Sequence, residues 1–231
     1  MLSVRNACAV YPGGIRAFSG ISFEAEAREN VALIGANGAG KTSLLLALVG
    51  ILPLSAGSVS VGGVDLDPEN PGELRRKTGL VFQNPEDQLF MPSIYEDLVF
   101  GPRNLGLSAE QAARRAAGAL ELLGIPHLKD RSPLRLSGGE KRLAAIATVL
   151  TMRPEVMLFD EPTAFLDPRA RRSLVATLRP LPHTKIIATH DLPFAAEVCT
   201  RALILKDGAI YAQGEPGALF SDTALMEKCG L

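Results

Sequence analysis

The sequence predicts an α/β fold in which a sheet core is interrupted by a helical insertion. Short apolar runs of β type recur before glycine or polar breaks in both terminal parts of the chain, as expected for strands covered on both faces. The middle differs, because three helix starts with capping-box spacing lie between Ser93 and Met152. These patterns predict a core over about residues 1–83 and 153–231, with a helical subdomain over about 84–152.

The predicted strands are short and mostly apolar. They are Ser3–Val10, Ile21–Glu26, Val31–Ile34, Val59–Val61, Gly79–Phe82, Val156–Phe159, Lys185–Ala188, Ala202–Leu205 and Ala209–Ala212. Between the last two, Asp207-Gly208 predicts a tight hairpin.

The predicted helices are marked by their end signals. Capping pairs are Ser93 with Glu96, Ser108 with Gln111, and Ser137 with Glu140. An alanine-rich helix over Ala109–Leu123 stops at Gly124, another helix begins at Asp167-Pro168, and Asp222–Cys229 is helix-like. The apolar run Leu44–Leu54 is too short to span a bilayer and predicts a buried helix.

The composition limits the possible functions. The chain has 231 residues, 47% of them hydrophobic, and its 24 basic and 25 acidic side chains give a formal charge of −1. This balance gives no reason to expect a nucleic-acid surface. Cys8, Cys199 and Cys229 lack metal-ligand spacing and are expected to be reduced thiols in the cytosol. The start of the chain does not resemble a signal peptide, so we expect any membrane connection to come through a partner.

A glycine-rich loop follows the strand Val31–Ile34 and precedes a helix-like stretch. Its residues are Gly35, Ala36, Asn37, Gly38, Ala39, Gly40, Lys41 and Thr42. Backbone N–H groups of such a loop turn toward phosphate oxygens, while the lysine reaches the β and γ phosphates and the threonine hydroxyl can bind Mg²⁺. The helix that begins there adds its positive dipole end. The sequence therefore predicts a nucleotide-phosphate site.

Two acids end the apolar strand Val156–Phe159. Asp160 can hold the water shell of Mg²⁺, and Glu161 can polarise an attacking water. Such a pair alone could be a solvated strand end. After a phosphate loop and a long insertion, it indicates nucleotide hydrolysis.

The segment Leu136-Ser137-Gly138-Gly139-Glu140 predicts a second anion site. A helix that begins with a serine and two glycines presents its N-terminus without bulky side chains. One nucleotide would not use both sites from a single subunit if they lie on separate subdomains. We therefore expect Ser137 to act on a nucleotide bound by another subunit.

These motifs, together with His190, resemble the ATP-binding cassette (ABC) ATPase family over the whole chain. The resemblance implies one domain over 1–231: a P-loop NTPase core of mixed sheet and helices, an inserted α-helical subdomain and an N-terminal antiparallel β region. It implies ATP and Mg²⁺ as ligands and hydrolysis of ATP to ADP and phosphate. The implied roles are adenine stacking for Tyr11, phosphate binding for Lys41, the α-phosphate for Ser43, Mg²⁺ coordination for Thr42 and Gln83, the metal's water shell for Asp160, general base for Glu161, γ-phosphate contact for His190, and a place in the dimer-interface loop for Asp167.

Some residues do not indicate a function by themselves. Others depart from the family pattern. Tyr11, Gln83 and His190 would each be unremarkable singly, and only their joint presence supports these roles, whereas His127 and His183 match no motif. Glu140 stands where many cassettes carry glutamine, but it can still complete the capping box. Phe165 is bulky where the family usually has a small residue, so its effect on the dimer interface stays open.

The segment Val81–Phe90 resembles the energy-coupling factor importers. The continuation Glu140-Lys141-Arg142 and the run Thr163–Arg172 are similar to the cobalt or nickel branch, with a vitamin importer as the alternative. This resemblance implies a transmembrane coupling subunit, a substrate-binding membrane subunit and a peripheral place on the cytoplasmic face of the inner membrane. Both halves of the composite site occur in one sequence, so a homodimer is sufficient, although a heterodimer with a second ABC ATPase is also possible.

Three other functions remain as alternatives. The chain could power another ABC importer, or it could be a cassette acting on nucleic acid, which would usually carry paired cassettes, zinc inserts or basic segments. It could also be a regulatory cassette that binds ATP without hydrolysing it. Glu161 argues against the last alternative.

Overall fold

The computed structural model describes residues 1–67 and 69–231, which divide into two compact units. The first unit comprises Met1–Leu80, Glu155–Glu161 and Pro182–Leu231, and the second comprises Val81–Pro154 and Pro162–Leu181. Residues 162–181 thus belong to the second unit. Within that unit, α6 (Pro168–Leu178) packs on α5 (Gly138–Leu150).

The first unit contains a four-stranded antiparallel sheet in the order β2-β1-β4-β5. Its strands are β1 (Leu2–Val10), β2 (Arg16–Ala25), β4 (Ala56–Val61) and β5 (Val64–Asp65). In β2, Ile21, Phe23 and Ala25 are buried while the residues between them are exposed. This period-two alternation directs one face of the sheet into the hydrophobic core.

A six-stranded sheet in the order β10-β9-β3-β8-β7-β6 carries the candidate site. Its strands are β3 (Asn30–Ile34), β6 (Thr78–Val81), β7 (Val156–Asp160), β8 (Thr184–Thr189), β9 (Arg201–Lys206) and β10 (Ala209–Gly214). Strands β3, β7, β8 and β9 are parallel, whereas β10 is antiparallel to β9. Every residue of β7 and β8 is buried, as expected for parallel strands covered on both faces.

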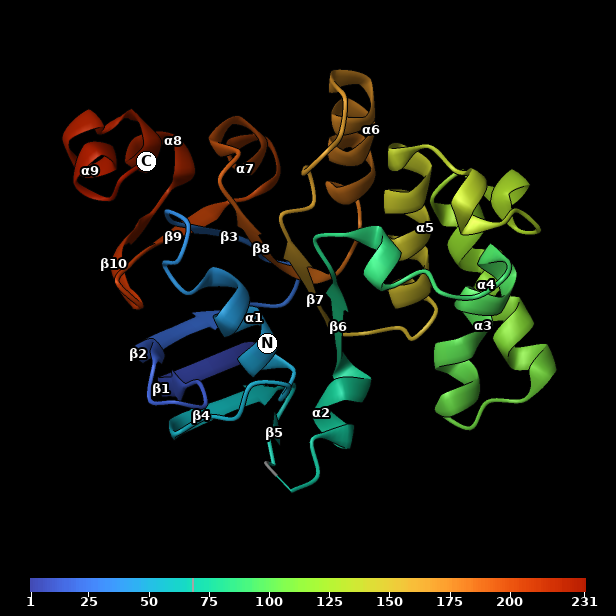
Figure 1. Cartoon of the computed structure of the whole chain (residues 1–231), viewed down its shortest axis with the longest axis horizontal. Coiled ribbons are helices and arrows are strands. Elements are labelled where there is room, and N and C mark those ends of the chain that lie inside the picture. Colours follow the sequence, from blue (N-terminus) through green and yellow to red (C-terminus); the bar gives the residue numbers. More distant parts are fainter. Residues whose placement is uncertain (68) are drawn as a thin grey trace. The chain divides into compact units, whose positions relative to one another are not determined.

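The helices of this unit are α1 (Lys41–Leu48), α2 (Gly72–Lys77), α7 (Leu192–Val198), α8 (Pro216–Ser221) and α9 (Thr223–Lys228). Helix α1 contacts both β2 and the parallel strands β7 and β8, and Figure 1 shows it between the two sheets. This position explains why α1 is apolar nearly all round.

The predicted helix over Leu44–Leu54 is too long. Helix α1 ends at Leu48, and Gly50 follows with φ +67°. The N–H groups of Ile51 and Leu52 then both donate to the carbonyl of Leu46. A glycine in the left-handed region closes the helix, so the apolar composition beyond it does not continue the helix.

The second unit is helical. It contains α3 (Ile94–Asn104), α4 (Ala109–Leu122), α5 and α6, with short 3₁₀ turns η1 (Pro85–Asp87), η2 (Pro126–Leu128) and η3 (Pro133–Arg135). Helices α3, α4 and α5 pack on one another, as Figure 1 shows. Among residues 1–67 and 69–231, no helix has the length and apolar character needed to cross a bilayer.

The predicted helix starts are confirmed. Ser93, Ser108, Ser137 and Asp167 each cap a helix with a side-chain oxygen, and complete capping boxes form at Ser108 and Ser137. At Ser93 the hydroxyl instead donates to the carboxylate of Glu96 at 2.8 Å. Each cap contributes about 1 kcal/mol to stability.

Candidate functional site

The glycine-rich loop joins β3 to α1 at the carboxyl end of the parallel strands. Gly38 and Gly40 adopt φ values of +82° and +100°. A Cβ atom on Gly40 would lie 2.8 Å from the carbonyl oxygen of Ala17, and one on Gly35 would lie 2.6 Å from that of Leu205. The loop therefore needs glycine both for its backbone conformation and for its packing.

Lys41 is the first residue of α1 and is only 7% exposed. Its Nζ donates to the carbonyl oxygens of Gly35 at 2.6 Å and Ala36 at 3.2 Å. Burial lowers the pKa of Lys41, and the nearby carboxylates of Glu161 and Asp160 partly oppose this shift. The Lys41 ammonium group thus lies inside the turn of the loop. In that position it can bind an anionic ligand.

Thr42 and Asp160 come together from two elements. The Thr42 hydroxyl donates to the two Asp160 carboxylate oxygens at 2.9 and 3.1 Å. Asp160 ends the buried strand β7 and is 7% exposed. Hydroxyl and carboxylate oxygens are the hard ligands that Mg²⁺ prefers, so this pair fits a magnesium ion bound together with a nucleotide.

Glu161 and His190 form the second contact at this end of the sheet. His190 Nδ1 lies 2.9 Å from Glu161 Oε2, and the backbone N–H of His190 lies 3.3 Å from the same oxygen. The Glu161 side chain is 10% exposed and that of His190 is 68% exposed. Glu161 also adopts φ +43°, with its N–H donating to the carbonyl of Ala188. A carboxylate in a fixed position thus lies beside an accessible imidazole.

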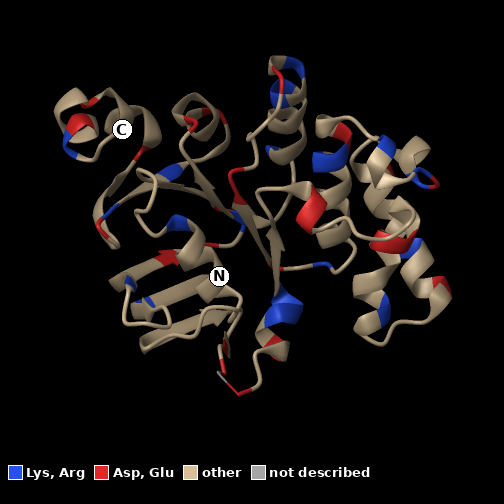
Figure 2. Cartoon of the chain, in the orientation of Figure 1, with Lys and Arg blue, Asp and Glu red and all other residues tan. Residues whose placement is uncertain are grey.

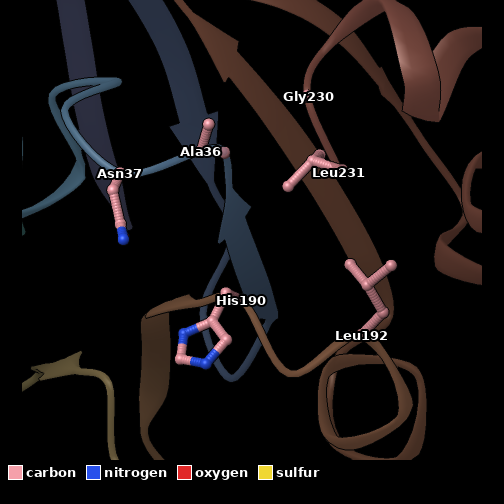
Figure 3. A pocket seen from close by; sticks show the side chains of 7 residues that line it. Ala36, Asn37, His190, Leu192, Gly230 and Leu231 are labelled. Atoms are coloured by element: carbon pink, nitrogen blue, oxygen red, sulfur yellow. The ribbon is translucent and has the colours of Figure 1, made fainter.

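A hollow of about 300 Å³ adjoins the phosphate loop. Figure 3 shows Asn37, His190, Leu192 and Leu231 around it, and Gly35, Ala36 and Gly230 complete the lining. The sequence patterns identified the loop residues and His190 but gave no signal for Leu192, Gly230 and Leu231. Those three residues belong to no sequence motif, and only the fold brings them next to the phosphate loop.

Tyr11 lies in the turn between β1 and β2 and is 37% exposed. Its hydroxyl forms a hydrogen bond of 3.0 Å with Ser43 Oγ. Two residues that the resemblance assigns to the nucleotide are thus in direct contact. Ala39, the remaining residue of the loop, is buried, and its N–H donates to the carbonyl of Ala36.

The second unit brings together the other predicted residues. Ser137 caps α5 in a capping box whose Glu140 Oε2 accepts from the Ser137 N–H at 2.8 Å and from its hydroxyl at 2.7 Å. These hydrogen bonds lower the pKa of Glu140. Glu140 therefore completes the capping box with Ser137.

The N-termini of α5 and α6 are neighbours. A Cβ atom on Gly139 would lie 3.0 Å from the Cβ of Ala170, and one on Gly138 would lie 3.8 Å from the carbonyl oxygen of Phe165. Asp167 caps α6 by accepting from the Ala170 N–H at 2.8 Å. Both helix starts line a hollow of about 570 Å³. Figure 2 shows basic residues along α6, which are Arg169, Arg171 and Arg172, and of these Arg169 lines the hollow.

Phe165 and Gln83 also belong to the second unit. Phe165 is 88% exposed with φ +62°, a conformation that bulky residues rarely adopt. Gln83 follows β6 with an exposed side chain, and its carbonyl oxygen accepts from Arg142 at 2.6 Å. The predicted site residues thus form two groups, one in each unit.

Comparisons with known proteins identify the family of this chain. The family model for ABC transporters matches residues 18–164. The energy-coupling factor transporter ATP-binding protein EcfA of Methanothermobacter thermautotrophicus is 41% identical over 236 residues, covering 100% of this chain and 76% of the relative.

Two solved structures show the same fold. CbiO1 of Clostridium perfringens, described as part of the ABC transporter complex cbiONQ, is 36% identical with a TM-score of 0.85, covering 98% of this chain and 93% of that one. An ATP-binding cassette solved as a dimer in a post-hydrolysis state with ADP and phosphate is 26% identical with a TM-score of 0.81, covering 94% of this chain and 99% of that one. These likenesses confirm the predicted fold class and the resemblance to energy-coupling factor ATPases. The chain therefore belongs to the ATP-binding proteins of the ABC transporter family, which hydrolyse ATP to drive transport.

Proposed function

We propose that this chain is the ATP-hydrolysing subunit of an energy-coupling factor type importer for cobalt or nickel ions. The observation that carries the proposal is the contact of Thr42 with Asp160, beside the pair formed by Glu161 and His190, at the end of a sheet that also holds the phosphate loop. The similarity to EcfA supports the class of importer. The ion rests on the sequence resemblance of Glu140-Lys141-Arg142 and of Thr163–Arg172 to the cobalt or nickel branch, and a vitamin is the alternative solute.

The residues of the first unit would bind the nucleotide. Tyr11 would stack on adenine, Ser43 would contact the α-phosphate, and the backbone of residues 35–42 with Lys41 would hold the other phosphates. Thr42, Asp160 and Gln83 would hold Mg²⁺ directly or through its water shell. When bound, Mg²⁺ supplies neutralisation of phosphate charge.

Hydrolysis would depend mainly on positioning. Glu161 would accept a proton from the attacking water as general base, and His190, exposed beside it, would contact the γ-phosphate. The His190 N–H donates to Glu161 Oε2, and His190 Nδ1 lies 2.9 Å from the same oxygen, so both contacts hold the Glu161 carboxylate in one orientation. Little covalent chemistry is required of the protein, because orientation and charge stabilisation supply most of the rate in phosphoryl transfer.

The residues of the second unit would complete a site on a second copy of the chain. Ser137, Gly138 and Gly139 would contact the γ-phosphate of a nucleotide bound by the partner, with Asp167 in the interface loop. The dimeric solved cassette supports this arrangement. A homodimer is sufficient, and a heterodimer with a second ABC ATPase is the alternative.

Closure of this dimer would move the membrane partner through the surface after Gln83. The partners would be a transmembrane coupling subunit and a substrate-binding membrane subunit, with the ATPase peripheral on the cytoplasmic face of the inner membrane. A nucleic-acid partner is disfavoured because the formal charge of the chain is only −1.

Purification of the tagged chain from detergent-solubilised native membranes tests the proposal. We expect mass spectrometry to find a coupling subunit and a cobalt or nickel binding subunit, and the complex to hydrolyse ATP. Recovery of a vitamin-binding subunit instead would show that the transported solute is a vitamin. Recovery of nucleic acid or ribosomal proteins, with no membrane subunit, would contradict the transport function.

A further inference from the structure

A buried arginine joins α5 to the residues that follow β6. Arg142 is 1% exposed, and its Nη1 and Nη2 donate to the carbonyl oxygens of Phe82 at 2.7 Å and Gln83 at 2.6 Å. We call residues 82–88 the glutamine segment. Arg142 thus binds the backbone of Gln83 and of the residue before it.

Three further contacts join the same two elements. Gln88 Nε2 donates to the carbonyl oxygen of Ala145 at 2.7 Å and to Thr148 Oγ1 at 2.8 Å, while Gln88 Oε1 accepts from the Phe82 N–H at 3.2 Å. An ion pair of 2.5 Å connects Lys141 with Glu86.

The contacts from α5 lie along one stripe of that helix. They come from Lys141, Arg142, Ala145 and Thr148, which are spaced so that they share one helix face. The whole glutamine segment is therefore fixed to the helix that begins at Ser137.

The fork of the arginine suits this contact. A guanidinium presents several N–H donors in fixed geometry, so one side chain can satisfy two consecutive carbonyl groups, whereas a lysine ammonium is a single point of charge. Removal of the fork would take the arginine donors away from both carbonyl oxygens, which lie in a partly buried contact.

We propose that Arg142 and Gln88 are positioning residues that hold the glutamine segment on α5, so that Gln83 and Ser137 move as one body during the ATP cycle. This inference rests on the proposed function, in which Gln83 serves the nucleotide of its own chain and Ser137 serves that of the partner. The metal ligand and the loop that contacts the partner's nucleotide would then be placed together.

Binding of Mn²⁺, a spectroscopic substitute for Mg²⁺, tests the proposal without hydrolysis. The protein is loaded with a non-hydrolysable ATP analogue, and free Mn²⁺ is titrated by electron paramagnetic resonance. We expect Arg142→Lys to weaken Mn²⁺ binding roughly tenfold, as loss of the support behind a metal ligand commonly does. If Arg142→Lys does not fold, Gln88→Leu should weaken binding in the same way.

Arg75→Lys is a matched control. Arg75 also donates to two consecutive carbonyl oxygens, those of Val49 and Gly50, which lie in the first unit and outside the glutamine segment. We expect it to leave Mn²⁺ binding unchanged. Gln83→Ala is the reference for loss of the ligand itself. Unchanged Mn²⁺ binding in Arg142→Lys and Gln88→Leu, with weakened binding in Gln83→Ala, would overturn the inference but leave the proposed function intact.

A cross-link tests the common movement independently of the metal. Glu86→Cys and Lys141→Cys are combined with Cys8→Ser, which removes the partly exposed native thiol, and joined by a short bifunctional thiosulfonate. If the two elements stay together, the cross-linked protein retains ATP hydrolysis. Loss of hydrolysis that a reducing agent restores would overturn the inference. If Gln83→Ala leaves Mn²⁺ binding unchanged, the proposed metal role of Gln83 fails, and the cross-link alone decides whether the elements move together.

Discussion

Glu161 shows how a single residue can combine an unusual backbone with a chemical role. Glu161 directly follows β7 and adopts a φ of +43°. Its N–H donates to the carbonyl oxygen of Ala188, and its carboxylate lies against the N–H and Nδ1 of His190. A left-handed residue other than glycine costs about 1–3 kcal/mol and is often found at functional sites. The fixed carboxylate therefore fits the general base better than a solvated strand end.

Glu161→Gln should bind ATP but hydrolyse it about 10²–10⁴-fold more slowly, because the amide keeps the shape and loses the basicity. The variant should also accumulate as a dimer with ATP. Single-turnover hydrolysis and light scattering after size-exclusion chromatography measure both effects. If the variant hydrolyses ATP at a rate close to that of the unaltered chain, Glu161 is not the general base.

Phe165→Gly should raise the free energy of unfolding by about 1 kcal/mol, because glycine accepts a φ of +62° without strain. If the exposed ring packs on the partner, the same change should weaken the ATP-dependent dimer in the Glu161→Gln background. Thermal unfolding and light scattering measure the two effects.

The control is Asp207→Gly, at another left-handed position in the hairpin between β9 and β10. It should not weaken the dimer. Equal dimer formation by the Phe165→Gly and Asp207→Gly variants would exclude a contact of Phe165 with the partner.

At the scale of elements, the sequence predicted most strands and helix starts because these have local causes. The apolar runs of β7 and β8 and the serine caps act within a few residues. The two-residue strand β5 and the short helices α2 and α8 were not predicted, because their sequences carry too few periodic residues. The predicted end of α1 was wrong because Gly50 closes the helix although the apolar composition continues beyond it.

Ser137→Ala should destabilise the protein by about 1 kcal/mol through loss of the helix cap. Hydrolysis should fall far more than this accounts for, while ATP binding by the monomer is retained, because Ser137 would act on the partner's nucleotide. Nucleotide titration and steady-state hydrolysis measure the two properties.

Ser108→Ala is the matched control, since Ser108 forms the same capping box on α4 of the same unit. It should cost similar stability and leave hydrolysis unchanged. Parallel losses of ATP binding and hydrolysis in Ser137→Ala would argue against action across an interface.

At the scale of the whole molecule, the site was predictable only in part. Lys41, Thr42, Asp160 and Glu161 follow from local motifs. Tyr11, Gln83 and His190 required the resemblance, since each alone would be an ordinary surface or packing residue. The contacts of Arg142 with the glutamine segment depend on residues about 60 positions apart, and no local pattern indicates them. The division into one ATPase domain with a helical subdomain over 84–152 stays a prediction.

Mixing two inactive variants tests the central claim, that each hydrolytic site combines residues of two copies. One variant is Glu161→Gln and the other is Ser137→Arg, each expected to be nearly inactive alone. A mixed dimer would hold one site with an intact Glu161 and an intact Ser137 from different chains. We expect an equal mixture, with coupling subunit present, to recover about a quarter of the unaltered activity if subunits pair at random. An equal mixture that stays as inactive as either variant, although mixed dimers form, would contradict the account.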